Sequence, residues 1–266
     1  MNTSRNKFKG RVATLRQRIM DTLKWWIFPG VNLHARERFR IVPLHFRGGE
    51  GRSQTMLDAG FGNGMLSLQA WRRGYRVIGV SLKESEVRGA RRLFNEKLGI
   101  SEGEICFLDH NLYDTDGLKR RYGEFDEIVC ADVIEHIVDD RGICAAFYSL
   151  LKPGGYLHLT TPNADHPYNA NFPLDLEEKG GHVRAGYNEA AFRDLLGPIG
   201  FQVEAPFGFG GAIRQWFNSR TKALQERFGP WAGVPCFLVA LPLLPLDSRS
   251  PAVPFSYYVR ARKPAE

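Results

Sequence analysis

The chain has 266 residues, of which 43% are apolar and 24% are charged, so it is long enough to bury one sizeable core. Its four cysteines are scattered without a Cys-x-x-Cys pair or a His/Cys cluster, which argues against a disulfide framework and a zinc site. The amino terminus lacks the apolar core and cleavage site of a secretory signal, so we expect a cytoplasmic protein.

The positive charge is concentrated in the amino-terminal region, because residues 1–52 hold 12 Lys/Arg against 3 Asp/Glu, or +9, whereas the whole chain carries +7. Within it, residues 8–28 mix basic with apolar and aromatic side chains at roughly helical spacing. We interpret residues 1–53 as a basic helical arm that caps the site. Contact with the inner membrane face and a merely solvated helix face are the alternatives. His34, Arg36 and Arg38 are its candidates for approaching an acidic ligand group.

From Thr55 onward, short β-rich apolar runs alternate with longer segments of helical spacing, which is typical of an α/β fold with a mostly parallel, doubly wound sheet. The predicted strands are 54–59, 75–80, 104–108, 126–131, 155–161, 201–206 and 256–262. The predicted helices are 64–73, 84–98, 115–122, 141–151 and 188–199.

We expect residues 54–266 to form one domain with two irregular insertions, residues 162–187 and 206–250. The second contains the longest apolar run, Trp231 to Leu246, which is uncharged but holds three prolines. Because this run is shorter than the roughly 20 residues that a helix needs to cross a bilayer, we expect no transmembrane span.

A glycine-rich turn follows the first predicted strand, as Asp58-x-Gly60-x-Gly62-x-Gly64. Glycines there let the backbone turn tightly and lie against a bulky ligand. A dinucleotide fingerprint requires Gly-x-Gly-x-x-Gly, which this spacing does not match. The segment resembles the first motif of class I S-adenosylmethionine-dependent methyltransferases.

Later segments resemble the small-molecule branch of that family, which includes ubiquinone-type O-methyltransferases: residues 125–137, 150–157 and 160–163, in order and with sensible spacing. The resemblance covers about residues 54–206. It implies a Rossmann-like, seven-stranded sheet with the last strand antiparallel, and S-adenosyl-L-methionine as cofactor. The implied cofactor-binding residues are Asp58, Gly60, Gly62, Gly64, Ser81, Asn111, Leu112 and Ala131, with Asp109 as the alternative to Asn111 at the adenine.

The second strand departs from this family, because Ser81 stands where an acid usually accepts both ribose hydroxyls. A serine makes only a weaker, single contact. Glu84 or Glu86 in the next turn is expected to compensate.

Methyl transfer to an alcohol or phenol requires a base, and imidazole suits that task near neutral pH. His136 and His182 are the catalytic candidates. Arg184, Tyr187 and Asn163 are candidates for binding the acceptor, because binding groups concentrate on loops over a rigid scaffold. Some ubiquinone-type relatives employ magnesium, which Asp132 and Glu135 could bind here, but we predict no metal.

The leading hypothesis is O-methylation of a small-molecule, natural-product or lipid-linked acceptor by in-line transfer. The alternatives are lipid C-methylation or cyclopropane formation, a nucleic-acid methyltransferase and a non-catalytic cofactor-binding protein. Nucleic acid is disfavoured because the fourth strand is not followed by an Asn-Pro-Pro-Tyr type sequence that would hold a flipped base. The acceptor and the oligomeric state do not follow from the sequence.

Overall fold

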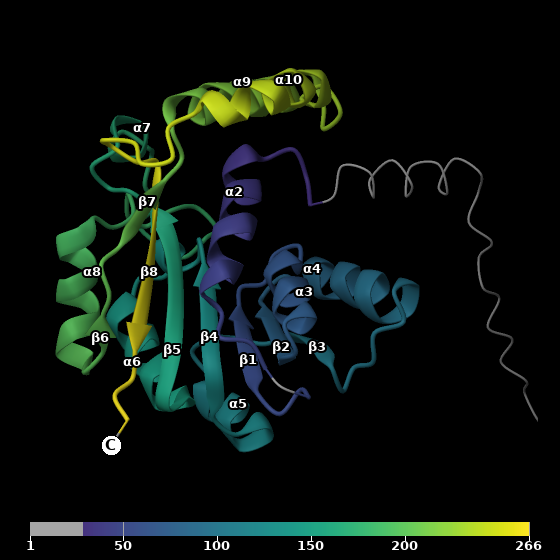
Figure 1. Cartoon of the computed structure of the whole chain (residues 1–266), viewed down its shortest axis with the longest axis vertical. Coiled ribbons are helices and arrows are strands. Elements are labelled where there is room, and N and C mark those ends of the chain that lie inside the picture. The colour runs from purple at the N-terminus through teal and green to yellow at the C-terminus, as the bar shows by residue number, and fades with distance from the viewer. Residues whose placement is uncertain (1–28, 50, 266) are drawn as a thin grey trace, which may run out of the picture.

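One mixed sheet runs through the molecule with helices on both faces (Figure 1). The computed structural model describes residues 29–49 and 51–265, so the predicted amphipathic stretch 8–28 lies outside the described residues. The strand order is β3-β2-β1-β4-β5-β8-β6, and β7 pairs with β8. The strands are β1 (Thr55–Ala59), β2 (Arg76–Ser81), β3 (Ile105–Asp109), β4 (Phe125–Ala131), β5 (Leu151–Pro162), β6 (Gln202–Val203), β7 (Phe207–Phe209) and β8 (Ser256–Arg262).

The pairing confirms the predicted doubly wound, mostly parallel fold with an antiparallel last strand. In the centre, Leu57 of β1 lies opposite Ile78 of β2 and Ile128 of β4 in parallel register. β8 runs antiparallel to β5, β6 and β7, with Leu159 opposite Val259. The short β7 makes eight strands where the sequence predicts seven.

Two layers of helices cover the two faces, because successive side chains of a strand point to opposite sides. α5, α6 and α8 pack through residues such as Leu118, Phe147 and Phe192 against one face. α3, α4 and the segment after it pack against the other face, where Phe94 is fully buried. These helices are α3 (Met65–Arg72), α4 (Glu84–Ala90), α5 (Thr115–Tyr122), α6 (Asp140–Leu150), α7 (Pro167–Ala170) and α8 (Glu189–Leu196).

Side-chain caps explain where several helices begin, since the first backbone N–H groups of a helix lack partners within it. Asp114 accepts a hydrogen bond from the Gly117 amide at the start of α5, and Asp139 accepts one from Gly142 at the start of α6. Asn188 does the same for α8. The boundaries predicted for these three helices are close to the observed ones.

The structure corrects three predictions. The helix expected over 84–98 is α4 followed by a π-helical segment, η2 (Arg91–Lys97). The strand expected over 201–206 shrinks to the two residues of β6. The region 206–250, expected to be irregular, is mainly helical: α9 (Ala212–Phe228), α10 (Val234–Ala240) and the 3₁₀ helix η5 (Leu241–Leu246).

Ahead of β1, the described part of the arm forms a helix, α2 (Leu33–Ile41), and a 3₁₀ turn, η1 (Val42–His45). α9 and α10 form a layer that lies across the outer end of α2, away from the sheet (Figure 1). The Leu33 amide donates to Asn218 of α9 at 2.9 Å, and the buried Arg214 of α9 pairs with the buried Glu37 of α2 at 3.0 Å. Among the described residues, no helix is both long and apolar enough to span a membrane.

Candidate active site

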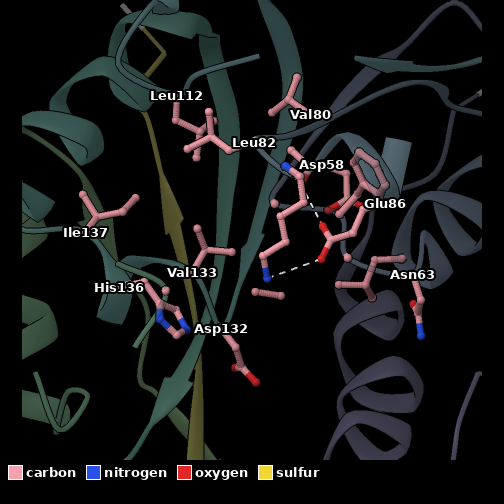
Figure 2. Close-up of a pocket in the computed structure, with 18 of the residues that line it drawn as sticks. Asp58, Asn63, Val80, Leu82, Glu86, Leu112, Asp132, Val133, His136 and Ile137 are labelled. Carbon is pink, nitrogen blue, oxygen red and sulfur yellow. Dashed lines mark hydrogen bonds and ion pairs between the residues drawn. The ribbon is translucent and has the colours of Figure 1, made fainter. Parts of the chain in front are cut away.

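A cavity of about 670 Å³ opens at the carboxyl ends of the central strands (Figure 2). This is the edge at which ligands bind in open α/β sheets, and the volume lies within the usual range of about 300–1,000 Å³ for small-molecule sites. Its walls come from the turns after β1, β2, β3 and β4, from α2 and from the loop after β5. Of the predicted cofactor-binding residues, the following line it: Asp58, Gly60, Gly62, Ser81, Asn111, Leu112 and Ala131.

The glycine turn after β1 forms the floor of the cavity. Gly62 has φ +54°, and a Cβ built on it would meet nothing within 4 Å, so the space above it is open. Gly60 has φ +78°, and a Cβ there would lie 2.4 Å from Val133. Gly64 does not line the cavity, and a Cβ on it would collide with Phe94 at 2.5 Å. The first two glycines therefore shape the cavity, whereas Gly64 permits close packing.

Asp58 lies at the end of β1 and is almost fully buried. The hydroxyl of Ser67 donates to its carboxylate at 2.6 Å. Burial raises the pKa of Asp58 to about 6, although the hydrogen bonds from Ser67 and the charge of Arg38 act in the opposite direction.

At the end of β2, Ser81 is joined to an acid from the next turn. Its hydroxyl donates to Glu86 at 2.7 Å, and Lys83 lies 3.6 Å from the same carboxylate (Figure 2). Glu86 lines the cavity, whereas Glu84 pairs with Arg88 outside it. Of the two acids that the sequence left open, only Glu86 is therefore placed to meet a ligand.

The turn after β3 brings Asn111 and Leu112 to the cavity wall, with Leu82 from the turn after β2 nearby (Figure 2). The Asn111 side-chain oxygen accepts a hydrogen bond from the Tyr113 amide at 3.0 Å. Asp109 is exposed and is absent from the wall. The geometry therefore favours Asn111 over Asp109 as the residue near an adenine.

The turn after β4 begins at Asp132, which has the left-handed φ of +53°. Its carboxylate accepts a hydrogen bond from Thr160 at 2.9 Å and forms an ion pair with Arg38 of α2. Burial lowers the pKa of Arg38 to about 10, while the negative charges of Glu135 and Asp58 act to raise it. Because that pKa lies well above neutral pH, Arg38 remains a cation at the cavity wall.

His136 follows in the same turn and points into the cavity (Figure 2). Its Nδ1 lies 2.8 Å from the Gly181 carbonyl oxygen. A carbonyl can only accept, so Nδ1 carries the hydrogen, and in the neutral ring Nε2 is an acceptor. His182 does not line the cavity, but its ring packs edge-on against that of His136 with the centroids 4.6 Å apart. Burial and the neighbouring His136 lower the pKa of His182.

The loop after β5 closes over this edge through Glu178, a cavity residue that sequence reasoning missed. One carboxylate oxygen of Glu178 accepts from the Tyr113 hydroxyl and from the Val138 amide, both at 2.6 Å. The loop thereby connects the turn after β3 with the turn after β4. No local pattern in the sequence distinguishes Glu178 from its exposed neighbour Glu177.

A model of the methyltransferase-domain family matches residues 33–205, which is more than half of the chain. The chain belongs to this methyltransferase family. The membership of the class I methyltransferase family that the motifs predict is thereby confirmed.

Two curated relatives fit the predicted small-molecule branch. The methyltransferase is 33% identical to the ubiquinone biosynthesis O-methyltransferase of Xanthomonas axonopodis pv. citri over 143 residues, which are 53% of this chain and 56% of that protein. It is 26% identical to the protein of the same name from Acinetobacter baylyi over 168 residues, 60% of this chain and 68% of the relative. The match thus spans little more than half the length of the Xanthomonas relative.

Solved structures agree with the methyltransferase fold. A SAM-dependent methyltransferase from Archaeoglobus fulgidus has a TM-score of 0.53 at 17% identity, covering 92% of this chain and 99% of that one. The [4+2]-cyclase SpnF has the same TM-score and identity and covers 94% of this chain and 83% of its own. At this identity the likeness shows the fold alone.

The residues predicted to bind the acceptor lie behind the cavity of the methyltransferase. Arg184 donates to the carbonyls of Ile134 and Ile137, both at 2.7 Å, and the buried Tyr187 hydroxyl donates to Asp140. These contacts hold the turn that carries His136. Asn163 is also buried: its amide group donates to the Pro254 carbonyl at 2.9 Å, and its side-chain oxygen accepts from Asp165. None of the three lines the cavity.

Of the three candidates on the arm, only Arg38 reaches the cavity. His34 is buried against Phe255, with the two rings stacked at 4.0 Å, and burial lowers the pKa of His34 to about 4. Arg36 donates to the Gly30 carbonyl at 2.6 Å and lies over the ring of Phe237. His34 and Arg36 therefore fix α2 in place.

Glu135 lies beneath His136, fully buried and without a hydrogen-bond partner for either carboxylate oxygen within the described chain. Burial raises its pKa to about 7 against the opposing charges of Arg38 and Arg184. One ligand atom each from Glu135, His136 and His182 lies within 4.8 Å of the others, so these residues could hold a metal ion. The sequence analysis predicts no metal, and that remains a prediction.

Proposed function

We propose that this methyltransferase methylates an oxygen of a small-molecule or lipid-linked acceptor, with His136 as the base. The observation that carries the proposal is the hydrogen bond from Nδ1 of His136 to the Gly181 carbonyl, which leaves Nε2 as the acceptor in a cavity. The O-methyltransferase names of the curated relatives support an oxygen acceptor.

The donor side of the cavity suits S-adenosylmethionine. The open space above Gly62 is a cradle that any Cβ would fill, so the main chain there can lie against the ligand. Glu86 would accept the ribose hydroxyls in place of the missing acid at Ser81. Arg38 would pair with the carboxylate of the methionine portion, and Asn111 would meet the adenine amino group.

The bound sulfonium supplies an electrophilic methyl group, and the protein must align an oxygen with it. In-line displacement depends chiefly on such positioning. His136 Nε2 would take the proton of the acceptor hydroxyl as the oxygen–carbon bond forms and the carbon–sulfur bond breaks, leaving the sulfide as the neutral product. Arg184 would contribute by fixing the turn of His136 through the carbonyls that it holds.

Two variants test the assignment of the base. For His136→Gln we expect kcat for methyl transfer to a catechol such as 3,4-dihydroxybenzoate to fall by about 10²–10⁴-fold, with the Kd for S-adenosylhomocysteine unchanged. His45→Gln is the matched control and should keep the parental kcat, because His45 stacks on Tyr258 and does not line the cavity. Full activity of His136→Gln would refute the role of this base, and absence of binding of both S-adenosylmethionine and S-adenosylhomocysteine to the parent would refute the function.

The alternative of membrane contact through residues 8–28 concerns residues outside the described part of the chain.

A further inference from the structure

The outer layer formed by α9, α10 and η5 contains the least polar stretch of the chain. Residues 231–246 carry no charge over 16 positions. One side of this stretch is packed: Phe237 and Ala240 are buried together with Val31 and Leu33, which precede and begin α2. The packing fixes the stretch as a short helical bar across the outer end of α2 (Figure 1).

The other side of the bar is exposed and apolar. The relative exposures of Leu238, Val239 and Leu246 are 55%, 60% and 73%, and Leu241 and Leu243 are exposed as well. Contiguous apolar surface of this kind is uncommon on a soluble monomer and marks a site of interaction. Prolines at 235, 242 and 245 keep the bar short, which suits a segment that lies on a surface.

The margin of the bar is basic and aromatic. On α9, the guanidinium of Arg220 lies 5.4 Å from the ring of the exposed Trp216, and Arg227 lies over Phe228. Lys222 of α9 is also exposed and pairs with Glu226 at 3.8 Å. Basic side chains with aromatic rings at the edge of an apolar face are the composition of an interfacial helix at an anionic membrane.

The charge of the adjoining chain has the same sign. Residues 1–28 hold seven Lys/Arg against one Asp, and they include Trp25 and Trp26. This segment joins the described structure at Pro29, next to Val31, which is buried against the bar. The described chain thus begins beside the bar, and the segment that precedes it in the sequence is strongly basic, which favours a negatively charged partner.

We propose that the exposed face of α10 and η5, with the basic margin of α9, docks on an anionic lipid bilayer. The apolar side chains enter the headgroup boundary, and the arginines and lysines meet the lipid phosphates. The docked layer holds α2 through Arg214 and Glu37, and α2 lines the cavity with Arg38, so docking sets the cavity beside the membrane. Docking would give the cavity access to an acceptor held in the membrane, and this consequence rests on the proposed function. The docking itself is independent of the proposed function.

Flotation of the full chain with vesicles tests the proposal independently of methyl transfer. We expect the parent to float with phosphatidylcholine vesicles containing phosphatidylglycerol and to partition about tenfold less onto vesicles of phosphatidylcholine alone. The double variant Leu238→Glu/Leu246→Glu should lose about tenfold or more of its partition onto the anionic vesicles. The control Leu44→Glu/Leu98→Glu adds the same charge at other exposed leucines and should float like the parent.

Three outcomes would overturn the proposal. The first is a parent that does not float. The second is a Leu238→Glu/Leu246→Glu protein that floats as well as the parent, which would leave residues 1–28 as the membrane contact. The third is a parent that is dimeric in sedimentation velocity and becomes monomeric in this variant, which would make the face an interface between copies. Thermal unfolding at the parental Tm confirms that the substituted proteins are folded.

Discussion

The two sides of the cavity are built in different ways. On the proposed donor side, the wall residues lie close after a strand in the sequence: Gly62 and Asn111 are in the turns after β1 and β3, and Glu86 is in the first turn of α4, the helix after β2. On the proposed acceptor side, the turn that carries His136 is held by Arg184 from the loop after β5, and Glu178 comes from the same loop. The donor side depends on short segments of chain, whereas the acceptor side depends on contacts between distant ones.

The two sides also differ in whether their carboxyl groups have polar partners. Glu86 on the donor side shares a hydrogen bond with Ser81 and a nearby Lys83. Glu135 on the acceptor side is buried without such partners, and its pKa is raised accordingly. An unpaired buried carboxyl is costly for a fold, so we infer that the acceptor side is the less stable of the two.

The largest expected effect concerns Glu135. Its pKa is about 7 in the folded protein against 4.5 ordinarily, so the folded state holds the proton more tightly. The stabilisation is complete below pH 4.5 and is lost as the pH rises through 7. For Glu135→Gln we expect a gain of about 3 kcal/mol in the free energy of unfolding at pH 8 relative to the parent, and little change at pH 4.

Urea unfolding across this pH range measures the difference. The exposed Glu177→Gln is the control and should follow the parental profile. If Glu135→Gln parallels the parent from pH 4 to pH 8, the carboxyl is not an unpaired buried group and the contrast between the two sides fails.

The next effect concerns the glycine turn. Gly62→Val places a side chain in the open space of the donor side, and we expect the affinity for S-adenosylhomocysteine to fall about a hundredfold in isothermal titration. Gly99→Val is the matched control, because Gly99 also has a positive φ and no atom near its Cβ position but lies outside the cavity. If both variants lose affinity for S-adenosylhomocysteine equally, backbone strain explains the loss and the side chain in the cavity does not.

A smaller effect is expected from Glu86→Gln, which removes the charge that would hold the ribose. The affinity for S-adenosylhomocysteine should fall about tenfold, since a charged hydrogen bond contributes more than a neutral one. Glu84→Gln, in the same turn but paired with Arg88, should bind like the parent. If Glu84→Gln loses affinity for S-adenosylhomocysteine and Glu86→Gln does not, the ribose contact belongs to Glu84.

The smallest effect is expected at Glu178, where the two sides meet. Glu178→Gln keeps the size of the side chain but weakens its bonds with Tyr113 and Val138, so S-adenosylhomocysteine should dissociate about threefold faster in stopped flow. Tyr113→Phe removes one of the two bonds and should reproduce the change. Unaltered dissociation in both would show that the loop does not retain the ligand.

The fold, and the residues after β1 and β3 that line the cavity, could be predicted from the sequence because their signals are local. The alternation of strands and helices and the run from Asp58 to Gly64 each lie within one short stretch. The choice between Glu84 and Glu86, or between Asp109 and Asn111, required the actual turns. In each pair, the two residues are only two positions apart in the sequence, yet one side chain lines the cavity and the other does not.

The acceptor side and the outer layer could not be predicted, because tertiary contacts decide them. α9 contains Asn218, Ser219 and Thr221, which are weak helix formers, and its packing on α2 through Arg214 supports it. Glu178 lies in a polar loop without periodicity. Arg184 was expected at the cavity because it lies in the loop after the fifth strand, whereas its guanidinium donates to the carbonyls behind His136.

Asp132 illustrates how two independent demands limit what evolution can place at one position. Its φ of +53° is adopted at low cost by glycine, asparagine and aspartate and at higher cost by other residues. Its ion pair with Arg38 and its bond from Thr160 require a carboxylate. Of the residues that adopt this φ at low cost, only aspartate carries the charge that pairs with Arg38, even though the side chain is partly open to solvent.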